Sequence, residues 1–148
     1  MTLWVFDTDH LSLQQRGNVL LANRISQVPL DTLAVTIISV EEQLYGRLNQ
    51  IRRSQNTEIM TVAYDDLQRT VRRFQSLRVL PFNSEAAQLY QGFLDQKIRI
   101  GSHDLRIAAI VLVHGGVLLT RNRRDFSKVP DLLIEDWTLQ VTDSSETV

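Results

Sequence analysis

Four acidic side chains stand where the chain is expected to leave a strand or begin a helix. Asp7 directly follows the apolar run 3–6, and Glu42 lies near the start of the helix expected after the run 33–37. Asp104 falls in the first turn of a helix starting near Ser102, and Asp125 follows the run 117–120 on a loop. Function gathers beyond the carboxyl ends of parallel strands. We therefore expect these four carboxyl groups to converge in one metal-sized pocket.

Such a cluster predicts a cation site. Like charges about 4 Å apart repel by several kcal/mol at intermediate dielectric, so a fold keeps them together only if a cation neutralises them or some stay protonated. Ligand sets made only of oxygen suit Mg²⁺ or Mn²⁺. Such an ion can activate water for attack on a phosphodiester. Thr8 and Asn122 are candidates for orienting the carboxylates, and Thr120 is a further one that is equally explained by packing at a strand end.

Each acid also has a purely structural interpretation. Asp7 and Asp104 could cap a helix or stabilise its dipole, and Asp125 could form a surface ion pair. Glu42 follows Ser39 by three residues, which is the spacing of a capping box. The case for a site rests on all four acids being placed at one end of the same sheet.

Apolar runs alternate with helical patterns along the chain. Buried strands are expected at 3–6, 33–37, 79–82, 117–120 and 132–134, and helices at 7–16, 19–28, 39–53, 57–77, from Ser84 onward, and from Ser102 to 114. The strands are continuous apolar runs, which is typical of strands covered on both faces. The order predicts an α/β fold with a mainly parallel central sheet of about five strands and helices on both faces.

Composition narrows the class of protein. The chain has 148 residues, 43% of them apolar and 22% charged, which predicts one globular domain over 1–141 and a flexible tail over 142–148. It has no cysteine, so thiolate metal sites and a cysteine nucleophile are excluded. The net charge of −1 argues against RNA binding by overall charge. We find no export signal or membrane-spanning run and expect a cytoplasmic protein.

Four segments together resemble one protein family, the PIN domains, and among them the VapC toxins of toxin–antitoxin pairs. Residues 6–12 (FDTDHLS) resemble the strand-ending Asp-Thr-Asn/Asp-x-Leu-Ser, and residues 39–46 (SVEEQLYG) resemble Glu-Leu-x-Tyr-Gly. Residues 101–109 (GSHDLRIAA) resemble the Asp-x-x-Ile-Ala-Ala helix start, and residues 119–130 (LTRNRRDFSKVP) resemble the Thr-x-Asn-x-x-Asp/Glu-Phe ending. The likeness extends from Leu3 to about Trp137.

The resemblance implies a divalent-metal-dependent endoribonuclease. Asp7, Glu42, Asp104 and Asp125 would be its metal-binding and catalytic acids, and Glu42, four residues before the glycine, would serve rather than Glu41. The family also implies a cognate antitoxin, a homodimer, and structured RNA such as tRNA or rRNA as substrate. Asp9 and Asp136 stand where the family often has Asn, and neither change removes a required acid.

Basic residues follow the last motif. Arg121, Arg123, Arg124 and Lys128 are candidates for gripping RNA, or they form an ordinary solvated surface. His103 could touch substrate, whereas His10 is expected to be a surface residue in the first turn of its helix.

Two other classes of protein compete with the nuclease. The segment 5–9 also resembles the Asp-x-Asp of haloacid-dehalogenase-type phosphatases, although His10-Leu11 stands where that family has Gly-Thr. A PIN-like scaffold without catalysis is the other alternative. RNA cleavage in Mn²⁺ would exclude the scaffold, and a phosphorylated Asp7 would favour the phosphatase.

Overall fold

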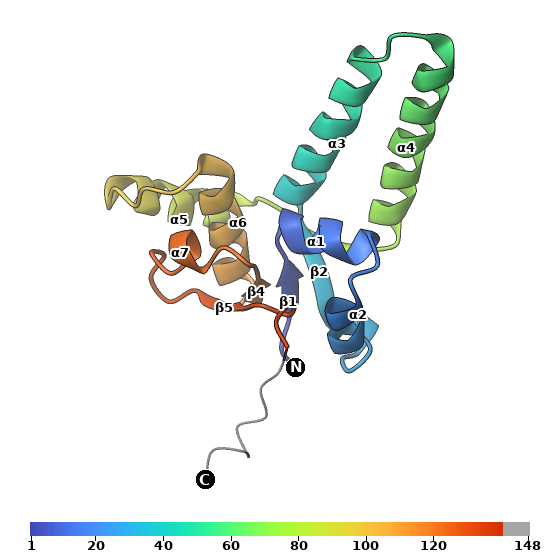
Figure 1. Ribbon diagram of the computed structural model, residues 1–148. Helices are drawn as coiled ribbons and strands as arrows, with labels where there is room; N and C mark the ends of the chain where they lie inside the picture. The colour runs from blue at the N-terminus through green and yellow to red at the C-terminus, as the bar shows by residue number, and fades with distance from the viewer. Residues whose placement is uncertain (141–148) are drawn as a thin grey trace.

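A parallel sheet forms the centre of the protein (Figure 1), in a computed structural model that describes residues 1–140. Its strands are β1 (Trp4–Phe6), β2 (Leu33–Thr36), β3 (Arg78–Leu80), β4 (Val117–Leu119) and β5 (Leu133–Glu135). The strand order is β3-β2-β1-β4-β5, and every neighbouring pair is parallel. The predicted five-stranded parallel sheet is confirmed, with β1 at its centre.

Helices cover both faces of this sheet. They are α1 (Thr8–Gln15), α2 (Val19–Ile25), the short 3₁₀ helix η1 (Leu30–Thr32), α3 (Ile37–Arg52), α4 (Thr57–Gln75), α5 (Ser84–Asp95), α6 (Ser102–Val113) and α7 (Arg123–Phe126). Successive strand residues point to opposite faces. Accordingly, Val5 and Leu118 pack in a core cluster with α5 and α6, whereas Phe6 and Leu119 pack in a second cluster with α1, α2 and the end of α4.

Helices α3 and α4 form a hairpin that projects beyond the sheet (Figure 1). A capping Asn56 accepts a hydrogen bond from Ile59 N–H and begins α4 after a short turn. Apolar side chains remain exposed on this hairpin, among them Tyr45, Leu48 and Val62. The hairpin therefore offers apolar surface that the protein's own core does not cover.

Three local expectations were wrong. Helix α3 is capped by Thr36, whose Oγ1 accepts the Ser39 N–H, so the expected capping box does not form and Glu42 lies beyond the first turn. Gly101, not Ser102, occupies the cap position of α6. Asp125 lies on the short helix α7 rather than on a loop. In each case the helix takes in residues that the sequence pattern left outside it.

No helix within residues 1–140 is long and apolar enough to cross a membrane. The tail expected at 142–148 lies outside the described residues.

Candidate active site

Three of the four predicted acids line one cleft at the carboxyl ends of β1 and β2. The cleft has a volume of about 530 Å³ and is lined by Asp7, Thr8, Asp9, Glu42, Asp104, Arg121, Asn122 and Phe126. Asp7 follows β1, Glu42 comes from α3 and Asp104 from the first turn of α6. The parallel order of the strands thus brings together acids that are far apart in the sequence.

Asp7 is both a helix cap and a wall of this cleft. Its backbone N–H donates to Leu119 O at 3.0 Å, which continues the pairing of β1 with β4. Its Oδ1 accepts the backbone N–H of His10 at 2.7 Å, so it caps α1. The Asp7 residue is only 7% exposed, and the capping role does not remove its carboxylate from the cleft.

Glu42 is held by a chain of hydroxyl groups. Thr8 Oγ1 donates to Glu42 Oε1 at 2.8 Å. Because the Thr8 hydrogen is used there, the 3.0 Å contact between the Thr8 and Ser39 hydroxyls has Ser39 as its donor. His103 approaches the other oxygen, with Nδ1 3.8 Å from Glu42 Oε2. Thr8 thus orients the Glu42 carboxylate, and Ser39 orients Thr8.

The carboxyl group of Asp104 has a pKa above its usual range. Burial raises the pKa of its carboxyl to about 6, and the negative charges of Glu42, Asp7 and Asp125 add to the rise. The nearby His103 acts in the opposite direction. The four acids are therefore close enough for their charges to interact.

Asp125 does not line the cleft. Its Oδ2 accepts a hydrogen bond from Asn122 Nδ2 at 3.0 Å, and Lys128 Nζ lies 3.9 Å from its Oδ1. Asn122 also caps α7 by accepting the Asp125 N–H. The hydroxyl of the buried Thr120 accepts the Asn122 N–H, and in the described part of the chain it makes no hydrogen bond to a carboxylate. Asn122 therefore fixes Asp125, and Thr120 shapes the turn.

A single metal-sized pocket is not preformed. Within residues 1–140, no three acidic or histidine side chains are grouped closely enough to hold an ion as they stand. Glu42 and Asp125 are instead each held by a donor of their own, Thr8 and Asn122. Even so, an all-oxygen donor set whose charges raise the pKa of Asp104 fits a hard divalent cation.

Of the predicted RNA-gripping residues, only Arg121 lines the cleft. Its Nε lies 3.8 Å from Asp9 Oδ2, so the pair crosses the rim of the site. Arg123 and Arg124 are exposed on α7, and Lys128 is the partner of Asp125. Asp9, whose role the sequence left open, thus belongs to the cleft.

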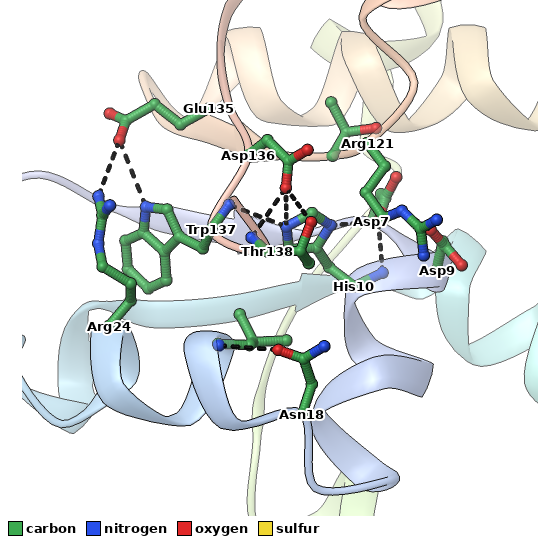
Figure 2. A network of polar contacts seen from close by, with 12 residues as sticks. Asp7, Asp9, His10, Asn18, Arg24, Arg121, Glu135, Asp136, Trp137 and Thr138 are labelled. Atoms are coloured by element: carbon green, nitrogen blue, oxygen red, sulfur yellow. Dashed lines mark hydrogen bonds and ion pairs between the residues drawn. The ribbon is translucent and has the colours of Figure 1, made fainter. Parts of the chain in front are cut away.

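The expectation that His10 is a surface residue was wrong. Its side chain is fully buried between Asp7 and Asp136, as Figure 2 shows. The sequence spacing is compatible with this burial, because residues three and four apart share a helix face, and His10 and Leu11 stand at these steps from Asp7. Both are buried against the sheet.

Comparison with known proteins gives the class and then the family. No protein-family model matches the chain. The structure is similar to VapBC-1 from nontypeable Haemophilus influenzae, with a TM-score of 0.74, 24% identity and coverage of 93% of this chain and 100% of that one. The fold is accordingly PIN-like.

The curated relatives identify the family. The chain is 30% identical over 142 residues to Ribonuclease VapC1 of Haemophilus influenzae strain R2866, covering 92% of this chain and 98% of the relative. A shorter match to Ribonuclease VapC of Rickettsia bellii is 40% identical over 58 residues, and it covers 36% of this chain and 43% of that protein. The chain belongs to the VapC family, the ribonuclease toxins of VapBC toxin–antitoxin modules. This membership excludes the phosphatase alternative.

Proposed function

We propose that this VapC-family ribonuclease cleaves RNA with Mg²⁺ or Mn²⁺ held by Asp7, Glu42, Asp104 and Asp125. The observation that carries the proposal is the cleft that brings Asp7, Glu42 and Asp104 together. Burial first, and then the negative charge of the other three acids, raises the pKa of Asp104 to about 6. A bound divalent cation would neutralise that charge, acidify water at the site and stabilise the negative charge of a phosphodiester under attack.

The residues around the acids have complementary tasks in this proposal. Thr8 keeps Glu42 turned toward the cleft, and Asn122, which itself lines the cleft, holds Asp125 behind it by a hydrogen bond to Oδ2. Arg121 on the rim would pair with an RNA phosphate by exchanging its Asp9 partner for it. Arg123, Arg124 and Lys128 extend the positive surface along α7 and beyond it.

An antitoxin is the proposed protein partner. Several structures with this fold are toxin–antitoxin complexes, including VapBC-1 and a complex from Klebsiella pneumoniae. We propose that a cognate antitoxin holds this chain inactive, that the chain forms a homodimer, and that its substrate is a structured RNA such as tRNA or rRNA.

Expression with and without the chromosomal neighbour tests the proposal. After removal of the antitoxin, the full chain should cut RNA in Mg²⁺ or Mn²⁺ and not in EDTA. Hydrolysis by water leaves 5′-phosphate and 3′-hydroxyl ends, whereas attack by the ribose 2′-hydroxyl leaves a cyclic phosphate. Sequencing of new RNA 5′ ends would give the cleavage site, and undiminished cleavage in EDTA would overturn the metal assignment.

A further inference from the structure

The His10 side chain is enclosed by two carboxylates that come from opposite ends of the chain (Figure 2). Its ring is 0% exposed. Nδ1 lies 3.5 Å from Asp7 Oδ1, and Nε2 lies 3.5 Å from Asp136 Oδ1. One of these acids lines the candidate active site, and the other follows β5.

The hydrogen bonds define which ring nitrogen carries the proton of the neutral imidazole. The backbone N–H of Trp137 donates to His10 Nε2 at 3.2 Å, so Nε2 presents a lone pair. The ring hydrogen of this tautomer is then on Nδ1. Among residues 1–140, Nδ1 of His10 is the one buried side-chain polar atom without a hydrogen-bond partner. The buried donor thus faces Asp7 without a completed bond.

The two contacts on Asp7 fall on the same oxygen. Oδ1 accepts the His10 backbone N–H at 2.7 Å, and the His10 ring approaches that same atom. No hydrogen bond to Oδ2 occurs in the described part of the chain. Asp7 therefore has one oxygen held by the protein and one left for the cleft.

The far side of the ring is anchored in the core. The Trp137 side chain is 1% exposed and packs against Trp4, with ring centroids 5.0 Å apart. Asp136 accepts the backbone N–H of Thr138 at 2.8 Å. The ring position is thus determined by a segment that cannot move without disturbing this core.

We propose that His10 is a positioning residue for Asp7. When a cation binds at Asp7, the Nδ1–H of His10 completes a hydrogen bond to Oδ1. This hydrogen bond fixes the rotation of the Asp7 carboxylate, so that Oδ2 is left to bind the ion. The present Nδ1 to Oδ1 distance is roughly 0.5 Å longer than an ordinary hydrogen bond, so only a small shift is needed. This inference rests on the proposed function, because it assumes that Asp7 is a metal ligand.

Two substitutions test the contributions of the two ring nitrogens of His10 separately. In His10→Asn the amide nitrogen can take the place of Nδ1 and donate to Asp7, whereas in His10→Gln the amide oxygen can take the place of Nε2 and accept from Trp137. Each variant keeps one contact and leaves a smaller side chain, so their melting temperatures in EDTA should fall comparably. Loss of a group that orients a metal ligand weakens metal affinity about 10–100-fold.

The measurement is Mn²⁺ titration of the full, antitoxin-free chain, followed by the kcat and KM of RNA cleavage. His10→Gln should lose Mn²⁺ affinity by about tenfold or more, with kcat falling and the KM for RNA unchanged. His10→Asn should lose clearly less. Equal losses, or a larger loss in His10→Asn, would overturn the proposal. If Asp7→Asn binds Mn²⁺ as well as the wild type does, the metal assignment itself fails instead.

Nitrogen-15 NMR of the His10 ring in the wild-type protein tests the same proposal without a substitution, so it still decides the question if a variant does not fold. The His10 ring should carry its hydrogen on Nδ1, and Mg²⁺ should move that proton downfield as its hydrogen bond shortens. A ring protonated on Nε2 alone, or a Nδ1 proton indifferent to Mg²⁺, would contradict the assignment of His10 as a positioning residue.

Discussion

Thr8 donates its hydroxyl hydrogen to Glu42 Oε1 across 2.8 Å, and Ser39 donates in turn to Thr8. The chain of hydroxyls joins the first turn of α1 to that of α3, so the two helices that follow β1 and β2 are held together beside the cleft. Serial hydrogen bonds of this kind strengthen one another. Glu42 is thereby fixed by residues that need not touch the substrate.

Replacing Thr8 with Val tests that role. The substitution keeps the branched shape and removes the donor, so Glu42 should turn more freely and both Mn²⁺ affinity and RNA cleavage should fall about tenfold. Thr8→Ser retains the hydroxyl and should keep most of both. Titration calorimetry and a cleavage assay check the pair, and wild-type behaviour of Thr8→Val would show that the hydroxyl chain is only structural.

Asp104 predicts a pH dependence of stability in the metal-free protein. Its pKa is raised from 3.8 to about 6 on folding, so the folded state binds the proton more tightly than the unfolded state does between these values. The protein should therefore lose stability as pH rises through this window, and the loss should level off roughly one unit above the raised pKa of about 6. Melting curves in EDTA at pH 4.5 and 7.5 measure the effect.

Asp104→Asn is the control for this dependence, because its side chain cannot ionise. The melting temperature of the wild type should fall relative to that of Asp104→Asn as pH rises, and saturating Mn²⁺ should remove the difference. Parallel pH profiles of melting temperature for the two proteins in EDTA would mean that ionisation of Asp104 does not destabilise the folded protein.

Arg121 and Asp9 form a pair whose members should have opposite effects on RNA binding. Arg121→Ala removes a phosphate partner and leaves Asp9 unpaired at the rim, so the KM for RNA should rise about fivefold, on the order of 1 kcal/mol. Asp9→Asn frees Arg121 and should lower KM. Arg72→Ala, on the exposed surface of α4, serves as the charge-matched control and should leave KM unchanged. If Arg121→Ala and Asp9→Asn changed the KM for RNA in the same direction, this role of the pair would be refuted.

The exposed apolar side chains of α3 and α4 predict self-association. Leu48 is 50% exposed and Val62 is 56% exposed on the projecting hairpin. We expect them in a homodimer interface of about 1,600 Å² in total. Light scattering of the antitoxin-free protein should show a dimer at micromolar concentration and a monomer for Leu48→Glu, with Leu30→Glu as an exposed apolar control on η1. A monomeric wild type would count against the prediction.

The sequence was sufficient to predict the sheet, because continuous apolar runs are local patterns. It did not predict the exact helix starts, since Thr36 and Ser39 can both cap a helix and Ser is the more common cap, so the choice depends on where β2 ends. The burial of His10 was also missed. Its neighbours Thr8 and Asp9 are polar, and the segment 135–138 that encloses the ring is distant in the sequence.

The grouping of the acids was only partly predictable. Strand order brings Asp7, Glu42 and Asp104 to one cleft. The orientation of each carboxylate, however, depends on local hydrogen-bond donors such as Thr8 and Asn122. A cation is what would draw such mutually repelling groups together.

Replacing Asp7 with Asn measures directly whether these acids form a metal site. The amide is a poorer ligand, so RNA cleavage should be abolished. The stabilisation of the wild type by Mn²⁺, about 2.7 kcal/mol at a hundredfold excess over the dissociation constant, should shrink, and the rise in melting temperature should shrink with it. The same change relieves repulsion on Asp104, so the metal-free variant should be slightly more stable than the wild type. Thermal melting with and without Mn²⁺ reports both effects at once. A variant that cleaves RNA like the wild type, or that loses cleavage only because it unfolds, would show that Asp7 is a helix cap and not a ligand.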